Sequence, residues 1–377
     1  MELDFTNYVK EELIYENDAS ASFFGYEFQV DAALYLFCEF YEDAKSFKVE
    51  SILQDIEIVN KDESKILCQA KAVQNPNANV NYSNKLHDAL VSLGRNRINN
   101  CHNYVYITNF DNPLGKTMQM QFNNKIVGYD YLNDEAKDIL KSNIDNIKNE
   151  IENKIKDRKT SDKTKKKLLS IRKNIDEFNI SEIKIISLTR YFDSKKGDTI
   201  IEKLADLLNN NFNIDSTKAS LVSKKIYILL HQKATLSGTL KDDNKHDKFK
   251  VITREDFCWP MIVANNMEIT ADEIEKFLDG DYDEDLRSYI ENSKSDLISK
   301  YNYELINRIT SDYSSYKNNK KGLKSDNFII NKWKDYRSEF PSEKEEPVKN
   351  KALTVFYLYC ILKDLSFTKK VIKGKEL

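Results

Sequence analysis

The sequence has little glycine, proline and cysteine. Its 377 residues include 9 glycines and 5 prolines, a content that favours helices over a many-turned all-β fold. The five cysteines are odd in number and form no CxxC pair, which argues against a zinc site or a disulfide framework and indicates a reducing cytoplasm. No apolar run approaches the roughly 20 residues of a membrane span, and the acidic N-terminus differs from a secretory signal. We therefore expect a cytoplasmic protein with no membrane association.

A strong net charge is also missing. The formal charge is −3, so the chain has no global basic field for nucleic acid, and any contact with DNA must come from a local patch. What is present is a core: 40% of the residues are apolar and 11% are aromatic. The chain is long enough to build two domains with well-buried interiors.

The first part of the chain predicts an α/β unit with a mixed sheet. Apolar residues recur at helical spacing in two segments, and the second of these opens with Ser83 as an N-cap. Between and after them lie runs rich in β-branched and aromatic residues, which are typical of strands. The predicted order is a helix over 25–44, strands over 51–59 and 65–73, a helix over 83–97 and a strand over 103–110.

The remainder of the chain is mostly helical in pattern. A charged segment at about 133–180 predicts a helical hairpin that is inserted before a strand over 182–192. We place a domain boundary after a further helix, with residues 1–212 as the first domain and 213–377 as a helical, partner-binding or regulatory domain. One strand is expected near residues 249–261. The last apolar helix, "LTVFYLYCILKDL", is either the core of this domain or a surface that packs into a partner subunit.

Polar residues alternate with apolar ones on the two predicted strands of the hairpin. Asp55 and Glu57 share one face of the first strand, and Gln69 and Lys71 share one face of the second. If both polar faces lie on the same side of the sheet, Asp55, Gln69 and Lys71 meet in one small volume. Such alternation is also normal for a half-solvated hairpin with no catalytic role.

This group of side chains suits metal-dependent hydrolysis of a phosphodiester bond. The Asp55 carboxylate and the Gln69 carbonyl are hard oxygen ligands of the kind that Mg²⁺ prefers, with Mn²⁺ as a substitute. Lys71 would orient the attacking water and stabilise the pentacovalent phosphate. Either Glu50, five residues before Asp55, or Glu27 on the preceding helix could complete the metal site.

The segments "FFGYEFQVDAALYLF", "VESILQDIEIV", "CQAKAV" and "YVYITNF", in this order, resemble a known nuclease domain. It is the N-terminal endonuclease domain of CD-NTase-associated anti-phage effectors, which also occurs in the nuclease subunit of Lamassu defence systems. The domain belongs to the PD-(D/E)xK restriction-endonuclease-like superfamily, in the subgroup with Gln at the second acidic position. On this resemblance Asp55, Gln69 and Lys71 match the motif, and Glu50, or Glu27 with Gln29, matches its upstream positions.

The resemblance covers about the first 110 residues and departs from the motif twice. Gln54 stands where the motif has proline, and the uncharged Gln69 leaves open whether one or two metal ions are bound. It implies a restriction-endonuclease-like domain with a helical insertion, followed by a mostly α-helical domain. It also implies a Mg²⁺-dependent DNA endonuclease that acts in anti-phage defence with an SMC-like ATPase and a small accessory subunit. We expect a homo-oligomer in the active state. The alternative is a non-catalytic assembly or regulatory subunit on a nuclease-like scaffold.

Two basic segments are candidates for contact with double-stranded DNA. Arg95 and Arg97 follow the second helix and could clamp a phosphate backbone. The lysine-rich stretch 159–173 either touches DNA or is a solvated helix face. The four histidines have no metal-ligand spacing, and "PLGKT" lacks the first glycine of a phosphate-binding loop.

Overall fold

The structure is a computed structural model. It describes residues 19–51, 53–75, 82–115, 122–189, 197–236, 251–254, 256, 261–262, 269–278, 280, 282–299, 303–319, 324–339, 346–363 and 365–373. Within these residues the chain forms an α/β part, built on a mixed sheet, and a helical part, so the coarse fold class predicted from the sequence is confirmed.

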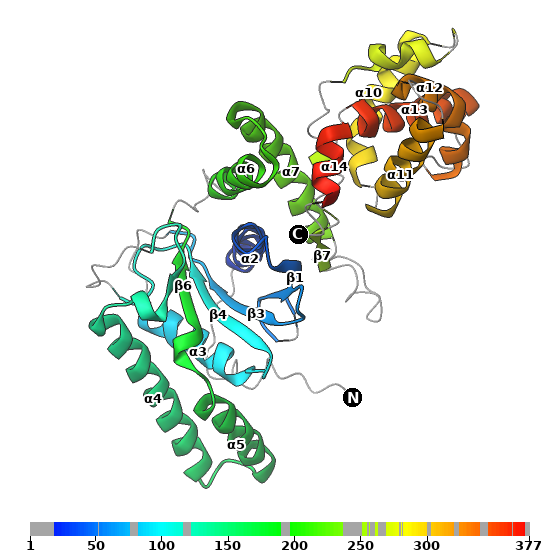
Figure 1. The fold of residues 1–377 in the computed structure, drawn as a ribbon. Helices are drawn as coiled ribbons and strands as arrows, with labels where there is room; N and C mark the ends of the chain where they lie inside the picture. Colours follow the sequence, from blue (N-terminus) through cyan, green and yellow to red (C-terminus); the bar gives the residue numbers. More distant parts are fainter. Residues whose placement is uncertain are drawn as a thin grey trace. The chain divides into compact units, whose positions relative to one another are not determined.

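The elements follow the predicted order closely (Figure 1). The sheet has the strand order β5-β6-β4-β3-β2-β1-β7. Its strands are β1 (Ala44–Val49), β2 (Ile56–Asn60), β3 (Lys65–Lys71), β4 (Cys101–Thr108), β5 (Val127–Gly128), β6 (Ile183–Ser187) and β7 (Val251–Thr253). The α-helices are α2 (Ala19–Glu39), α3 (Tyr82–Arg95), α4 (Asp134–Lys156), α5 (Asp162–Asp176), α6 (Asp198–Phe212), α7 (Ser216–Leu236), α10 (Glu284–Ser299), α11 (Tyr303–Asn319), α12 (Ser325–Lys332), α13 (Pro347–Lys363) and α14 (Leu365–Lys373). Short 3-10 helices are η1 (Tyr129–Tyr131), η2 (Ile180–Glu182), η3 (Ala271–Phe277) and η4 (Trp333–Glu339).

The chain divides into two compact units. The first unit comprises residues 1–32, 50–57 and 65–196, and the second comprises 33–49, 58–64 and 197–377. Helix α6, which lies inside the predicted first domain, belongs to the second unit. The division into domains at 212/213 stays a prediction.

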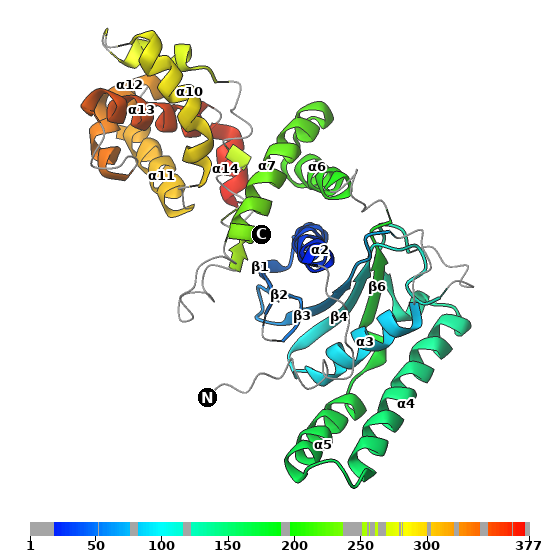
Figure 2. The ribbon, with the colours of Figure 1, turned by 180° about the vertical axis from the view of Figure 1, so that it is seen from behind.

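In the first unit, parallel strands form the base on which the candidate site is built. β3 pairs with β4, placing Gln69 opposite Tyr106, and β4 pairs in parallel with β6. Helix α3 covers one face of these strands, as Figures 1 and 2 show from opposite sides. Its buried stripe repeats every three to four residues and packs into a cluster with the inward side chains of the strands: Leu86, Ala89, Leu90 and Leu93 with Leu67, Tyr104, Tyr106, Ile183 and Ile185.

Helices α4 and α5 form the predicted hairpin insertion. The side chains of Asn133 and Ser161 cap their N-termini by accepting hydrogen bonds from the backbone N–H groups of the first turns. Near its C-terminus α5 lies very close to α3: a Cβ atom added at Gly94 would overlap the side chain of Ile175. Glycine at position 94 therefore lets the insertion seat directly against α3.

In the second unit, β1 and β7 are antiparallel, with Phe47 opposite Ile252, which confirms the strand expected near residues 249–261. Helix α13 is buried on almost every side and contacts α10, α11, α12, η3 and η4. The apolar C-terminal helix is therefore the core of the helical part, which was the first of the two readings of its sequence. In the described residues, no helix combines the length and apolar character needed to cross a membrane.

Four local predictions need correction. Helix α2 ends at Glu39 and the chain enters a strand at Ala44, where the sequence pattern predicted continued helix. Asp55 lies just before β2 and not within a strand. Helix α3 begins at Tyr82, so Ser83 lies in its first turn and is not the N-cap. The segment Ala271–Phe277 is a 3-10 helix, with a capping box formed by Thr270 and Glu273. The residues from 190 to 192 of the predicted sixth strand lie outside the described residues.

Candidate active site

The hairpin register places the polar residues of β2 and β3 on one side of the sheet. Asn60 N–H donates to the carbonyl oxygen of Ser64 at 2.8 Å, which closes the turn. One step into the hairpin, Lys65 Nζ lies 2.6 Å from Glu57 Oε1. Because side chains alternate along a strand, this ion pair fixes the face on which Gln69 lies as well.

Asp55 and Gln69 are in direct contact on that face. The Gln69 amide nitrogen donates a hydrogen bond to Asp55 Oδ2, and the backbone N–H of Ala70 donates to the same oxygen at 3.0 Å. Both of these hydrogen bonds go to Oδ2, so neither uses the second carboxylate oxygen, Oδ1. The predicted convergence of Asp55 with Gln69 is present in the structure.

Lys71 lies two residues beyond Gln69 on the same strand and close enough to act on Asp55 electrostatically. Its ammonium lowers the pKa of the Asp55 carboxyl group. Within the described residues, Lys71 forms no ion pair at 4 Å or less. The structure thus brings together the carboxylate, the amide and the ammonium group that the sequence singled out.

Asp55 is a desolvated carboxyl group. Burial raises its pKa to about 6, and this effect outweighs the opposing effects of Lys71 and the Ala70 N–H. The negative charge of Glu50 raises the pKa further, which places Glu50 near Asp55. Removing water and adding a like charge both penalise the ionised form of Asp55, and a bound cation would relieve both effects.

The loop that delivers Asp55 to β2 has a strained backbone. Glu50 has a φ of 55°, in the left-handed region that non-glycine residues seldom adopt. Its N–H donates to the carbonyl oxygen of Asp55 at 2.7 Å, and the Ser51 hydroxyl accepts hydrogen bonds from the N–H groups of Leu53 and Gln54 at 3.1 and 3.0 Å. These bonds close a tight turn whose two ends are Glu50 and Asp55.

Helix α3 anchors this loop from the side. Gln54 is 4% exposed; its Nε2 donates to the carbonyl oxygen of Ser92 at 2.7 Å, and its Oε1 accepts from the Ser92 hydroxyl at 3.0 Å. Asn96 donates from its side-chain amide to the carbonyl oxygen of Leu53. Sequence reasoning noticed Gln54 only as a departure from proline, and the structure shows it as the tether of the loop.

Two further residues near Lys71 were missed. Asn109, at the end of β4, exchanges two hydrogen bonds with the backbone of Val73, at 2.9 and 2.7 Å, and so fixes the chain just after Lys71. Lys85, in the first turn of α3, has its pKa lowered by burial and by the nearby ammonium of Lys71. The signal available in the sequence was the position of Lys85 near the start of a helix that follows β3.

The upstream acidic candidates are placed unequally. Glu50 lies beside Asp55, as the pKa of Asp55 shows. Glu27 lies on α2 and is half-buried; the preceding residue, Tyr26, has its pKa raised by burial and by Glu50. Glu27 as a metal ligand stays a prediction.

Arg95 and Arg97 are held by the hairpin insertion. Arg97 Nη1 donates to Glu177 Oε2 at 2.7 Å and to Asn99 Oδ1 at 3.0 Å. The carbonyl oxygen of Arg95 accepts from the Asn174 side chain at 2.8 Å. The charge of Arg97 is therefore already paired, and a role of these arginines in DNA binding stays a prediction.

The neighbouring cysteine and histidine play other parts. Cys68 is fully buried, and burial together with the charge of Asp55 raises the pKa of its thiol well above the usual value, so it packs in the core as expected. His87 lies on α3 beside Asp88, with its Nε2 3.2 Å from Glu150 Oε2. Among the described residues, no three His, Cys, Asp or Glu side chains are grouped for a metal ion.

Comparisons with known proteins add little to this geometry. No protein-family model and no curated protein matches the sequence. Among solved structures, the Cap4 SAVED/CARF-domain containing receptor of Moraxella osloensis is similar, with a TM-score of 0.33 and 14% identity. The match covers 65% of this chain and 48% of that receptor, so this chain aligns with about half of the receptor's length. At this TM-score the similarity carries no argument about fold or function.

Proposed function

We propose that this protein is a metal-dependent DNA endonuclease with a restriction-endonuclease-like first domain. The observation that carries the proposal is the meeting of Asp55, Gln69 and Lys71 on one face of the β2–β3 hairpin. A buried carboxylate, an amide and an ammonium group are the side chains that metal-assisted phosphodiester hydrolysis uses. The sequence resemblance to defence nucleases rests on the same three residues.

The donors fit a hard divalent cation such as Mg²⁺. Mg²⁺ is usually held by one or two carboxylates, with water and substrate phosphate completing its shell, so a group of three acidic side chains is not required. Asp55 and Glu50 would supply the carboxylates. The Gln69 nitrogen faces Asp55 in this structure, so a cation shared by both residues requires the amide to turn its oxygen inward.

The chain's own residues have separable roles in this proposal. When bound, the cation would lower the pKa of a coordinated water and neutralise phosphate charge. The Ala70 N–H and the tight turn from Glu50 orient the Asp55 carboxylate. Lys71 would hold the attacking water and stabilise the negative charge that develops on the phosphate. Lys85 lies close to Lys71 and adds a second positive charge for the substrate phosphate.

The wider biological role is part of the same proposal. The sequence resemblance supports an effector of a bacterial anti-phage defence complex of the Lamassu kind. In such a complex the helical part would restrain the nuclease, an SMC-like ATPase and a small subunit would be partners, and self-association would pair two active sites. Pull-down of the tagged chain from its native host, followed by mass spectrometry, tests this part separately from catalysis.

The test of catalysis compares the wild type with Asp55→Asn and Lys71→Ala on supercoiled plasmid with Mg²⁺. Lys65→Ala is the matched control, because Lys65 lies on the same strand and the same face but pairs with Glu57. We expect cleavage by the wild type and by Lys65→Ala, and a loss of at least about 100-fold in the other two. Equal cleavage by the wild type and Lys71→Ala would contradict the proposal.

A second measurement decides the case in which no protein cleaves DNA alone. Thermal unfolding of the wild type and Asp55→Asn is recorded with and without Mg²⁺. Stabilisation of the wild type alone shows a metal site that awaits activation by a partner. Identical behaviour of the two proteins, in unfolding and in cleavage, would favour the alternative, a non-catalytic assembly or regulatory subunit.

A further inference from the structure

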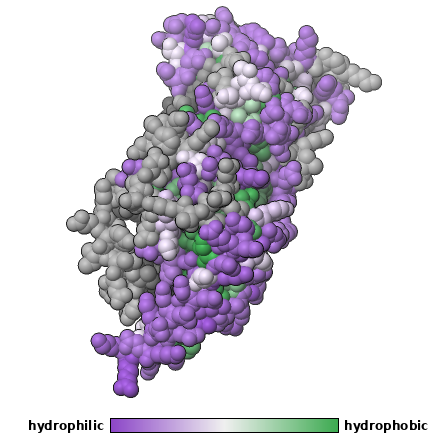
Figure 3. All heavy atoms as spheres, turned by 90° about the vertical axis from the view of Figure 1, so that its left-hand side faces the viewer, coloured by the Kyte–Doolittle hydropathy of each residue, from purple (hydrophilic) through white to green (hydrophobic). Residues whose placement is uncertain are grey.

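The turn between α4 and α5 carries a dense group of positive charges. Between residues 154 and 167, eight of the fourteen side chains are Lys or Arg and two are Asp, in a chain whose formal charge is −3. We call this group the basic tip. Its members are Lys154, Lys156, Arg158, Lys159, Lys163, Lys165, Lys166 and Lys167. Figure 3 shows the end of the molecule formed by α4 and α5, where the surface is mostly hydrophilic.

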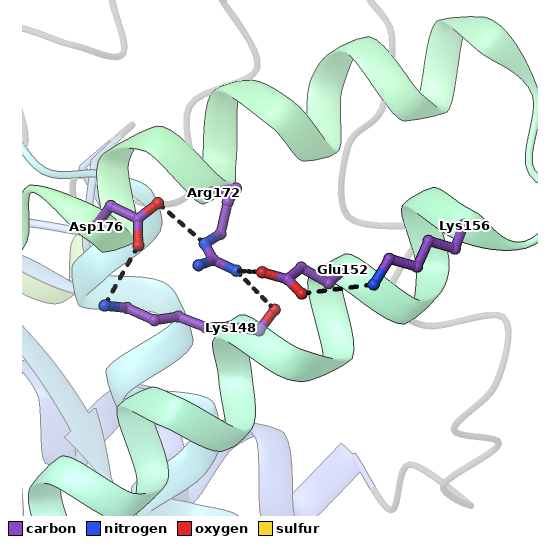
Figure 4. Close-up of polar contacts among 5 residues, drawn as sticks. All are labelled: Lys148, Glu152, Lys156, Arg172 and Asp176. Atoms are coloured by element: carbon purple, nitrogen blue, oxygen red, sulfur yellow. Dashed lines mark hydrogen bonds and ion pairs between the residues drawn. The ribbon is translucent and has the colours of Figure 1, made fainter.

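The base of the same hairpin is neutralised by an ion-pair network, and the basic tip is not. Figure 4 shows Arg172 of α5 between two acids: its Nη1 lies 2.6 Å from Glu152 Oε1 and its Nε lies 3.0 Å from Asp176 Oδ2. Lys148 pairs with Asp176 at 3.3 Å, and Lys156 reaches Glu152 at 3.8 Å. Six tip residues form no ion pair with a described residue: Lys154, Arg158, Lys159, Lys163, Lys165 and Lys166.

The position of these charges is unfavourable for the helix that carries them. Helix α5 begins at Asp162 behind the Ser161 cap, and its lysines fall in the first two turns, near the positive end of the helix dipole. Lys163 and Lys167 are also like charges at i and i+4, a spacing at which they repel. An anionic partner would remove this cost, which solvent exposure alone does not explain.

The turn presents its charges from an ordered backbone. The Asp157 side chain accepts from the N–H of Lys159 at 2.9 Å, and the Ser161 hydroxyl accepts from the N–H of Thr164 at 3.2 Å. The apolar side of the hairpin is turned inward, with Ile147 and Ile151 buried. The tip therefore lacks the broad apolar face with which an amphipathic helix enters a membrane.

We propose that the basic tip binds the phosphate backbone of double-stranded DNA. Residues 154–167 contain no aromatic side chain, whereas protein–protein hot spots are rich in Trp and Tyr, and lysine is depleted there. An array of lysines without such anchors matches a regular row of phosphates, which is bound through charge and independently of sequence. The inference extends the proposed nuclease function by naming the surface that holds the substrate duplex.

The experiment measures DNA binding without cleavage. Fluorescence anisotropy with a labelled 30-base-pair duplex in EDTA is recorded at several salt concentrations, with Asp55→Asn present in every protein. Lys163→Gln/Lys166→Gln is compared with Lys125→Gln/Lys141→Gln, which changes the net charge equally and also alters exposed lysines of the first unit. Because catalysis plays no part, failure of the nuclease proposal leaves this result readable.

We expect the tip variant to lose about tenfold in affinity at low salt, and its plot of log affinity against log salt to flatten by about 2, one unit for each phosphate contact. Its melting temperature should be unchanged or higher, since two charges opposed to the helix dipole are removed. The control variant should keep the wild-type slope. Equal slopes for the two variants, or a wild type without affinity for the duplex, would overturn the proposal. Loss of binding to phosphatidylserine vesicles with unchanged DNA binding would also overturn it.

Discussion

Gln54 and Ser92 exchange two hydrogen bonds across 38 residues of sequence, one from the Gln54 amide to the Ser92 carbonyl oxygen and one from the Ser92 hydroxyl to the Gln54 amide oxygen. This pairing joins helix α3 to the residue that precedes Asp55. The position of the candidate metal ligand therefore depends on a helix that contributes nothing else to its direct contacts.

Substitution of Gln54 should loosen this attachment. Gln54→Ala removes both hydrogen bonds and leaves the buried Ser92 groups without their partner, so we expect a loss of about 1–3 kcal/mol in the free energy of unfolding. Ser92→Ala removes only the hydroxyl bond and should cost less. Urea denaturation of the two variants and of the double variant measures the coupling between the residues. A coupling near zero would show that the two side chains do not support one another.

The pKa of Asp55 predicts how stability depends on pH. Burial raises it from 3.8 to about 6, so between these values the folded protein holds a proton that the unfolded chain has lost. The free energy of unfolding should therefore fall as pH rises from about 4 to about 6 and stay level above, by at most about 3 kcal/mol at 1.36 kcal/mol per pKa unit.

The difference between the wild type and Asp55→Asn isolates this contribution. The variant keeps an oxygen that can accept the Ala70 N–H but never carries the charge. We expect it to match the wild type in stability near pH 4 and to exceed it at pH 8. Denaturation curves at both pH values supply the comparison, and an equal difference at the two would mean that Asp55 titrates normally.

Magnesium should stabilise the protein in competition with protons. At pH 8 the Asp55 carboxylate is ionised, and saturation at 100 times the dissociation constant would add about 2.7 kcal/mol to the free energy of unfolding. At pH 5 most Asp55 groups are protonated and the effect should shrink. Calorimetric melting temperatures at both pH values test this, with Asp55→Asn expected to show no increase at either. A magnesium effect that persists in Asp55→Asn would place the ion elsewhere.

The ion-pair network at the base of the hairpin should be worth little in global stability. Arg172 and its partners are partly exposed, and such pairs usually contribute up to about 1 kcal/mol. Arg172→Met should still speed amide hydrogen exchange in α5, because both of its acidic partners are released. Lys166→Met, on the same helix but outside the network, should leave the exchange rates unchanged. Exchange followed by mass spectrometry, with β4 as the internal reference, separates these outcomes.

The parts of the fold that the sequence predicted are those with strong periodicity. The apolar stripe of α3 and the helical hairpin of α4 and α5 repeat over many residues, and both lie where the sequence places them. Strand β1 was missed because "AKSFKV" is short and directly follows the apolar run of α2. Its partner β7 lies about 200 residues away along the chain, and no local pattern carries that information.

The candidate site was predictable as far as alternation along strands reaches. The spacing of Gln69 and Lys71 places them on one face, and the hairpin turn brings Asp55 to them. The left-handed backbone of Glu50 and the tether from Gln54 to α3 could not be predicted, because each depends on contacts between distant segments. The nearness of Lys85 to Lys71 likewise comes from the way α3 packs on β3.

The absence of a side chain at Gly94 sets a limit on how the insertion can diverge. Any larger residue at that point must displace Ile175, whereas most side chains of the turn after α4 touch only solvent. A saturation scan of residues 133–180 should therefore divide into an intolerant root and a permissive end. The charge carried by that end could change from one descendant to the next while the helices beneath it kept their seat.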